Sequence, residues 1–120
     1  MIIINAKCEN GLGGDAFYET FHSAGSAAEV MAAIMKVPRN ETVADQWQSQ
    51  IFARILMKYH VILVSQMDQD LIRNMHLIPA HSVEEAIRLA DELLQKTDGT
   101  ITVIPMGISC MIQRPATEQA

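Results

Sequence analysis

The sequence predicts an α/β fold, a three-layer αβα sandwich around a small, mainly parallel sheet. Short apolar runs rich in Ile and Val alternate with amphipathic stretches of helical length. This alternation is typical of βαβ units, in which helices connect parallel strands and cover both faces of the sheet. A chain of 120 residues with 49% hydrophobic and 19% charged residues has the composition of one packed domain. We therefore expect a single α/β domain over residues 1–113 and a polar tail over residues 114–120.

Residues 2–8 are predicted to form the first strand. Their sequence, IIINAKC, is a short β-branched run, which is typical of a strand buried on both faces. Because a buried central strand at residue 2 would have no element before it, a domain boundary is expected at Met1.

Two amphipathic helices are predicted next. Phe17, Phe21 and Ala24 share one helical face within residues 14–25, and a glycine ends this stretch. Residues 26–36 begin with the capping-box pattern Ser-x-x-Glu and end before a proline.

A longer helix is predicted over residues 41–59. Its apolar side chains recur every four residues, which predicts a stripe that faces the core. The members of this stripe are Val43, Trp47, Ile51, Ile55 and Tyr59.

The middle of the chain predicts a second strand. Residues 60–65, HVILVS, are apolar between their polar ends and favour a buried parallel strand. A short helix capped by Asp68 is expected over residues 68–75. Residues 76–80 predict a short extended segment that is closed by Pro79.

The last predicted helix covers residues 82–96 and opens with a capping box made by Ser82 and Glu85. Residues 100–107, TITVIPMG, predict a third full strand, and residues 108–113 a fourth, antiparallel edge strand. The apolar stripe of the helix is formed by Val83, Ala86, Ile87, Ala90 and Leu94.

The loop CENGLGG, after the first strand, is the first candidate ligand site. Ligands of parallel sheets collect at the carboxyl ends of the strands, where helix N-termini offer unpaired N–H groups. Gly11, Gly13 and Gly14 could let the backbone approach an anion. Their spacing differs from the dinucleotide pattern G-x-G-x-x-G, and no P-loop lysine follows. A turn that needs positive φ is therefore the favoured interpretation of these glycines. Ser65, after the second strand, could contact a ligand or cap the next helix.

A second candidate site lies within the helix predicted over residues 41–59. Trp47, Gln50 and Arg54 stand at i, i+3 and i+7 and so share one side of that helix. Arg54 could pair with a small carboxylate while Gln50 donates a hydrogen bond to it. A core tryptophan with a polar rim is the favoured alternative.

Several functions are disfavoured by composition. A net charge of −5 and scattered basic residues argue against nucleic acid, and no apolar run approaches the ~20 residues that span a bilayer. The histidines and cysteines lack metal-ligand spacing, so no metal site is predicted within this chain. No nucleophile with an adjacent base is found, and no catalytic residue is nominated. Cys8 and Cys110 each stand beside apolar residues, which favours buried, reduced thiols in a cytoplasmic protein.

Several segments, in order, resemble the C-terminal domain of the nickel-dependent lactate racemase family. They are IIINAKCENGLGGDAFYETF, DQWQSQIFARILMKYHVILVS, LIRNMHLIPAHSVEEAI and TVIPMG, and together they cover nearly the whole chain. The resemblance implies a two-domain 2-hydroxyacid racemase or epimerase with a nickel pincer nucleotide in the cleft between its domains. It also implies hydride transfer from the substrate carbon to the cofactor and back, with two histidines as alternate acid–base groups.

The same resemblance implies that most of the catalytic groups lie outside this chain. The tethering lysine, the nickel-ligating histidine, the acid–base histidines and the substrate-binding arginine belong to the family's N-terminal domain, so no cofactor is expected in this chain alone. Trp47 matches a family tryptophan near the cofactor pocket, and the CENGLGG loop is expected to face the cleft. Leu12 stands where the family often has His, which favours a 2-hydroxy acid other than lactate itself.

Two classes of function follow. The first is the C-terminal domain of a nickel-pincer racemase or epimerase, inactive alone, with the N-terminal domain and a 2-hydroxy acid as partners. The second is a free-standing α/β module that binds a small acid or regulates another protein. On the first interpretation, the face left bare by the missing domain could also support a homodimer.

Overall fold

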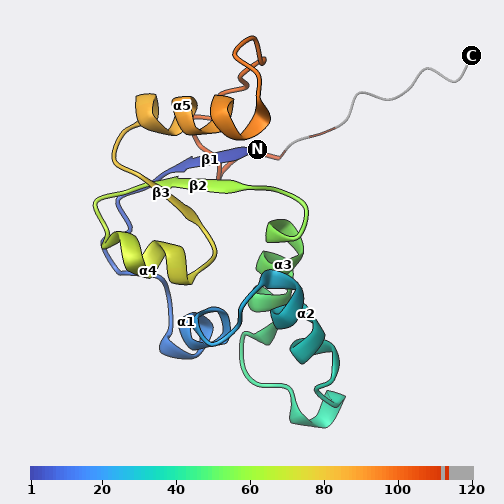
Figure 1. Ribbon diagram of the computed structural model, residues 1–120. Helices are drawn as coiled ribbons and strands as arrows, with labels where there is room; N and C mark the ends of the chain where they lie inside the picture. The colour runs from blue at the N-terminus through green and yellow to red at the C-terminus, as the bar shows by residue number, and fades with distance from the viewer. Residues whose placement is uncertain (112, 114–120) are drawn as a thin grey trace, which may run out of the picture.

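The computed structural model of the protein describes residues 1–111 and residue 113 (Figure 1). Strands and helices alternate as the sequence predicts, but the elements are shorter than the predicted segments. In chain order they are β1 (Ile2–Asn5), α1 (Asp15–His22), α2 (Ala27–Met35), the 3-10 helix η1 (Arg39–Glu41), α3 (Gln46–Leu56), β2 (Val61–Val64), α4 (Gln69–Asn74), β3 (Ile78–Ala80) and α5 (Val83–Leu94).

The three strands form a parallel sheet in the order β1-β2-β3. All four residues of β2 are buried, as expected of a central strand with helices on both faces. β1 was predicted to be a buried central strand, and this is wrong. It lies at the edge of the sheet, where Ile2 and Ile4 are 37% and 42% exposed, because it pairs with β2 alone within the described part of the chain.

The predicted three-layer arrangement is confirmed. Alternate side chains of β2 point to opposite faces of the sheet and join two separate cores. Val61 and Leu63 pack with Phe21 of α1 and with residues of α2, α3 and α4. Ile62 and Val64 pack with alanines of α5. Figure 1 shows α5 on one side of the sheet and α1 and α4 on the other.

Serine and aspartate side chains begin three helices at the predicted positions. Ser26 accepts a hydrogen bond from the Glu29 N–H at 3.2 Å, and Ser82 accepts one from the Glu85 N–H at 3.1 Å. Asp68 accepts the first free N–H groups of α4, as predicted. These side chains satisfy donors that have no partner inside the helix.

The stripe predicted for the helix over residues 41–59 faces the wrong way. Val43, Trp47 and Tyr59 are exposed, and Ile51 is 40% exposed; only Ile55 packs against the core. The fully buried positions of α3 are instead Ser49 and Ala53, flanked by half-buried Phe52 and Leu56. Small side chains on that face let α3 approach the neighbouring helices closely, and α2 is its main neighbour.

The apolar face of α5 is predicted correctly at its centre. Ala86 and Ala90 are buried against the sheet, and Ile87 is half-buried. Val83 and Leu94, at the two ends of the predicted stripe and of the helix, are 40% and 49% exposed.

Residues 100–107 do not form the predicted third full strand; the third strand of the sheet is β3, which was predicted only as an extended segment. Ile101 and Val103 are 63% and 77% exposed. The predicted edge strand is also absent over residues 108–111 and residue 113, while residue 112 lies outside the described residues. The polar tail predicted for residues 114–120 lies outside them too.

Two further predictions concern the burial of the cysteines and the absence of a membrane-spanning segment. Cys8 and Cys110 are both free thiols, but Cys8 is only half-buried and Cys110 is exposed, so the prediction that both are buried is wrong. Among the described residues, every helix is too short or too polar to cross a bilayer.

Candidate functional site

The loops that follow β1 and β2 meet at the carboxyl edge of the sheet. Just after β1, the Ala6 N–H donates to the Val64 carbonyl at 3.0 Å, which extends the pairing by one residue. The hydroxyl of Ser65, which is buried, donates to the Lys7 carbonyl at 3.2 Å and accepts from the Met67 N–H at 3.3 Å. Ser65 therefore does not cap α4, whose N-cap is Asp68; its hydroxyl holds the two loops together.

The glycine loop needs glycine at two of its three glycine positions. Gly11 and Gly13 have φ values of 77° and 97°, in the left-handed region that L-residues rarely adopt. Gly14 has an ordinary φ of −76° and stands at the N-cap of α1. A Cβ would meet no atom within 4 Å at Gly11 or Gly14, and only the Phe17 ring at 3.9 Å at Gly13. Backbone conformation, and not contact within the chain, is the reason for Gly11 and Gly13.

A cavity of about 510 Å³ lies behind the end of the loop, between α1, α2 and α3. Gly14 and Phe17 line one side, and the first turns of α3, including Gln46 and Ser49, line the other. Most of the remaining wall is apolar and comes from α2 and the segment before α3. Of the predicted site residues, only Gly14 reaches this cavity.

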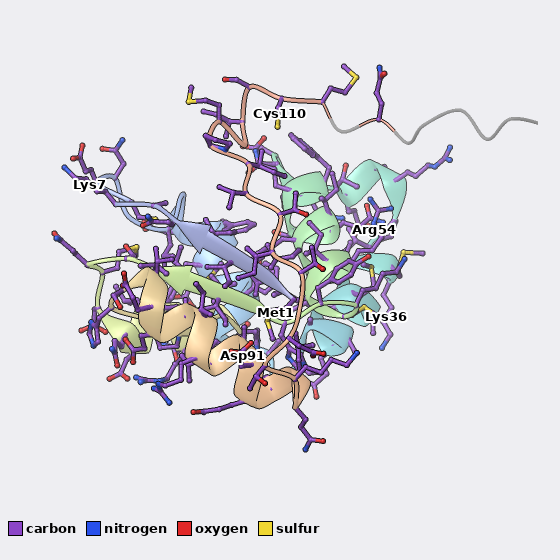
Figure 2. The ribbon with its side chains drawn as sticks, turned by 90° about the horizontal axis from the view of Figure 1, so that it is seen from above. Met1, Lys7, Lys36, Arg54, Asp91 and Cys110 are labelled. Carbon is purple, nitrogen blue, oxygen red and sulfur yellow. The ribbon has the colours of Figure 1, made fainter. Side chains whose placement is uncertain are left out.

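Trp47, Gln50 and Arg54 lie on the outer face of α3, opposite its buried face. Trp47 is 60% exposed, so the interpretation of it as a core tryptophan is wrong. Gln50 donates a weak hydrogen bond to the sulfur of Met35 in α2 over 3.8 Å. In Figure 2, Arg54 and Lys7, which follows β1, stand on opposite sides of the molecule. Lys7, just before the glycine loop, thus lies apart from Arg54, whereas Gly14 at the end of the loop lines the cavity together with the first turn of α3.

The described residues contain no group of three His, Cys, Asp or Glu side chains that could hold a metal ion. The ring of His76 lies 3.0 Å from the Phe21 carbonyl, and the ring of His81 contacts Gln69. The predicted site residues offer an aromatic plane, an amide and a guanidinium on the outer face of α3, and separately the backbone of the glycine loop. Such groups bind and orient a substrate or cofactor; they do not form a metal centre by themselves.

Comparison with known proteins decides the family. The model for the lactate racemase C-terminal domain matches residues 1–112, which is nearly the whole chain. The chain belongs to this family. The resemblance noted in the sequence is thereby confirmed.

Similar proteins with known structure or curated names agree with this membership. The lactate racemase of Thermoanaerobacterium thermosaccharolyticum is 37% identical over 94% of this chain, and that of Lactiplantibacillus plantarum is 38% identical over 93%. The solved structure of the Thermoanaerobacterium lactate racemase apoprotein matches 94% of this chain with a TM-score of 0.89. The chain spans 26% of the length of both curated relatives and 27% of the solved chain.

Two features of this lactate racemase C-terminal domain were missed from the sequence. The first is the role of Ser65, for which the sequence suggested ligand contact or helix capping. Its hydrogen bond to the Lys7 carbonyl joins residues 58 positions apart, and no local pattern records such a contact. The cavity was missed because its walls come from three helices whose relative placement no local pattern encodes. The sequence shows that Phe17 and Ile34 are apolar, but it does not show that a cavity lies between them.

Proposed function

We propose that this chain is the C-terminal domain of a nickel-pincer-nucleotide-dependent 2-hydroxyacid racemase or epimerase. It forms one wall of an interdomain cleft, and an N-terminal domain of the same polypeptide forms the other. The observation that carries the proposal is the family match over residues 1–112, together with relatives named lactate racemase that are about four times as long as the matched region.

The wall role fits the side chains that this domain offers. The family resemblance implies that the nickel ligand, the lysine tether and the acid–base histidines belong to the N-terminal domain, and the described residues include no metal-binding cluster. The bound nickel pincer nucleotide would supply the hydride acceptor for the reaction. Trp47, exposed on α3, would lie against the flat cofactor and exclude water from it.

Gln50 and Arg54 would orient the substrate from the same face of α3. Both side chains are exposed and free of a charged partner among the described residues. A guanidinium binds a carboxylate through two parallel hydrogen bonds, and the Gln50 amide could donate a third to the substrate.

The glycine loop would border the cleft at the carboxyl edge of the sheet. Gly11 and Gly13 turn the backbone sharply without side chains, and Gly14 is the N-cap of α1. The Gly11 N–H is already bonded to the Cys8 carbonyl at 2.9 Å, so the N-terminus of α1 is the part of the loop proposed to face a ligand. Leu12, half-buried against the core, replaces the histidine frequent in the family and offers no polar contact. The substrate is proposed to be a small 2-hydroxy acid, and this replacement favours acids besides lactate itself.

The chain alone is expected to be inactive and to hold no stoichiometric nickel. Because the two cysteines are free thiols, we place the protein in the cytoplasm, where thiols stay reduced. The family match disfavours a free-standing small-acid-binding module.

The test is to express the longest natural reading frame containing this chain, with the proteins that mature the cofactor, and to screen 2-hydroxy acids for racemisation. The 120-residue chain serves as the matched control. Racemisation by the longer polypeptide, with none by the chain, is the expected result. An in-frame stop codon directly upstream of the Met1 codon would overturn the proposal. Racemisation by the 120-residue chain alone would overturn it too.

A further inference from the structure

Residues 100–111, called the arm from here on, leave the end of α5 with large apolar side chains in solvent. Val103 is 77% exposed and Ile108 is fully exposed. The arm contains no charged residue, whereas the whole chain is 19% charged. Segments that remain in water are ordinarily charged and polar, so this composition is that of a covered segment. The exposed apolar residues are Ile101, Val103, Ile104, Met106, Ile108 and Met111.

The backbone of the arm is almost unpaired as well. Within the described part of the chain, its only backbone–backbone hydrogen bond joins the Ser109 N–H to the Met106 carbonyl at 2.8 Å. Thr and β-branched apolar residues alternate over residues 100–103, which in an extended chain places Ile101 and Val103 on one side. The arm therefore has the side chains and the free N–H and C=O groups of a strand that lacks a sheet.

The arm leaves the domain beside the open edge of β1. Residues 99–102 line a cavity of about 200 Å³ together with Met1 and Ile3, which flank and form this strand. β1 has no neighbour on its outer side within the described sheet, and its Ile2 and Ile4 are partly exposed. In Figure 2 the arm passes Met1 and carries Cys110 away from α5 on the side of β1. The start of the arm therefore lies beside the apolar residues of this edge.

We propose that the arm docks in extended form on the N-terminal domain of the same polypeptide, and that the open edge of β1 belongs to the same interface. This inference rests on the proposed function, which supplies that domain. The lengths of the relatives favour this occupant, because most of each relative lies outside the part that matches this chain. Strand addition would satisfy the free backbone groups of the arm while its apolar side chains enter pockets.

Cys110 gives the first readout, because it is an exposed thiol within the arm. Its rate of modification by a thiol reagent is measured by peptide mass spectrometry in the 120-residue chain and in the longest natural reading frame. The rate is expected to fall at least about tenfold in the longer polypeptide, where the arm is covered.

Charge substitutions give the second readout. Val103→Lys and Ile108→Lys should leave the Tm of the 120-residue chain unchanged, because both side chains are exposed in it. In the longer polypeptide each should lower the Tm by about 4 °C or more, since a charge is then placed in an apolar interface. Leu93→Lys is the matched control: it changes an apolar residue of α5 that is 47% exposed and lies outside the arm. It should leave both Tm values unchanged.

Three other results would contradict the arm proposal, its proposed occupant, or both proposals. Equal Cys110 rates in the two polypeptides, with neutral Lys variants, overturn the arm proposal, while racemisation by the longer polypeptide still upholds the proposed function. In the 120-residue chain, the Cys110 thiol could become less reactive as the protein concentration rises. That result overturns the proposed occupant in favour of a second copy of this chain. Absence of a longer reading frame overturns both proposals.

Discussion

The Ser65 hydroxyl donates a hydrogen bond to the Lys7 carbonyl over 3.2 Å, which joins the loops after β1 and β2. The same hydroxyl accepts from the Met67 N–H at 3.3 Å, so one side chain serves both loops. Ser65 is only 9% exposed, and little water can replace it. The orientation of the glycine loop relative to β2 thus depends on a residue outside that loop.

Ser65→Ala is expected to lower the free energy of unfolding by about 1 kcal/mol or more, because the part-buried hydrogen bonds to the Lys7 carbonyl and from the Met67 N–H lose this partner. Urea denaturation followed by circular dichroism measures the change. Ser23→Ala is the control, because the Ser23 hydroxyl also donates to a carbonyl, that of Glu19, but is exposed. A loss at Ser65 no larger than that at Ser23 would contradict the structural role.

Gly13 and Gly14 should respond differently to the same substitution. Gly13→Ser puts a side chain at φ 97° and is expected to cost about 1–3 kcal/mol. Gly14→Ser keeps an ordinary φ of −76° at the N-cap of α1 and should be neutral or slightly stabilising. Thermal unfolding of both variants checks the difference, and equal costs would refute the conformational argument.

In the longer polypeptide, Gly13→Val should abolish racemisation while the fold is retained.

Trp47 should matter for activity rather than for stability. Trp47→Ala is expected to cost less than about 1 kcal/mol in this chain, because the side chain is 60% exposed. Phe21→Ala, at a fully buried ring of α1, should cost about 3–5 kcal/mol. Chemical denaturation of both variants makes the comparison. In the longer polypeptide, Trp47→Ala is expected to reduce racemisation at unchanged stability; full activity would remove Trp47 from the proposed cleft.

The contribution of the Glu84 carboxylate to the stability of the fold is expected to depend on pH. Hydrogen bonds from its own backbone N–H and from the Ser82 hydroxyl lower the pKa of this carboxyl below its usual 4.5. A lowered pKa in the folded state stabilises the fold above the unfolded pKa, and that contribution is lost as the pH falls through the folded pKa. NMR titration should give a Glu84 pKa below 4.5 that rises in Ser82→Ala. An unchanged pKa in that variant would exclude the hydroxyl as a cause.

The helix α3 shows why a correct periodicity can still give a wrong face. Val43, Trp47 and Ile51 recur every four residues, and this pattern predicts helix without saying which side is covered. Ser49 and Ala53 are buried because their small side chains fit between α3 and its neighbours. A large apolar stripe is then left in solvent, as is usual of a surface that meets another domain.

The sequence by itself determined the alternation of strands and helices as far as the end of α5, the parallel sheet, the serine and aspartate caps, and the family. These depend on residues close together in the chain, where periodicity and side-chain hydrogen bonds act directly. Only the tertiary structure decided that β1 lies at an edge, that the arm forms no strand within this domain, and that Trp47 is exposed. Which strand pairs and which helix face is covered depend on contacts between distant segments, and local patterns do not record them.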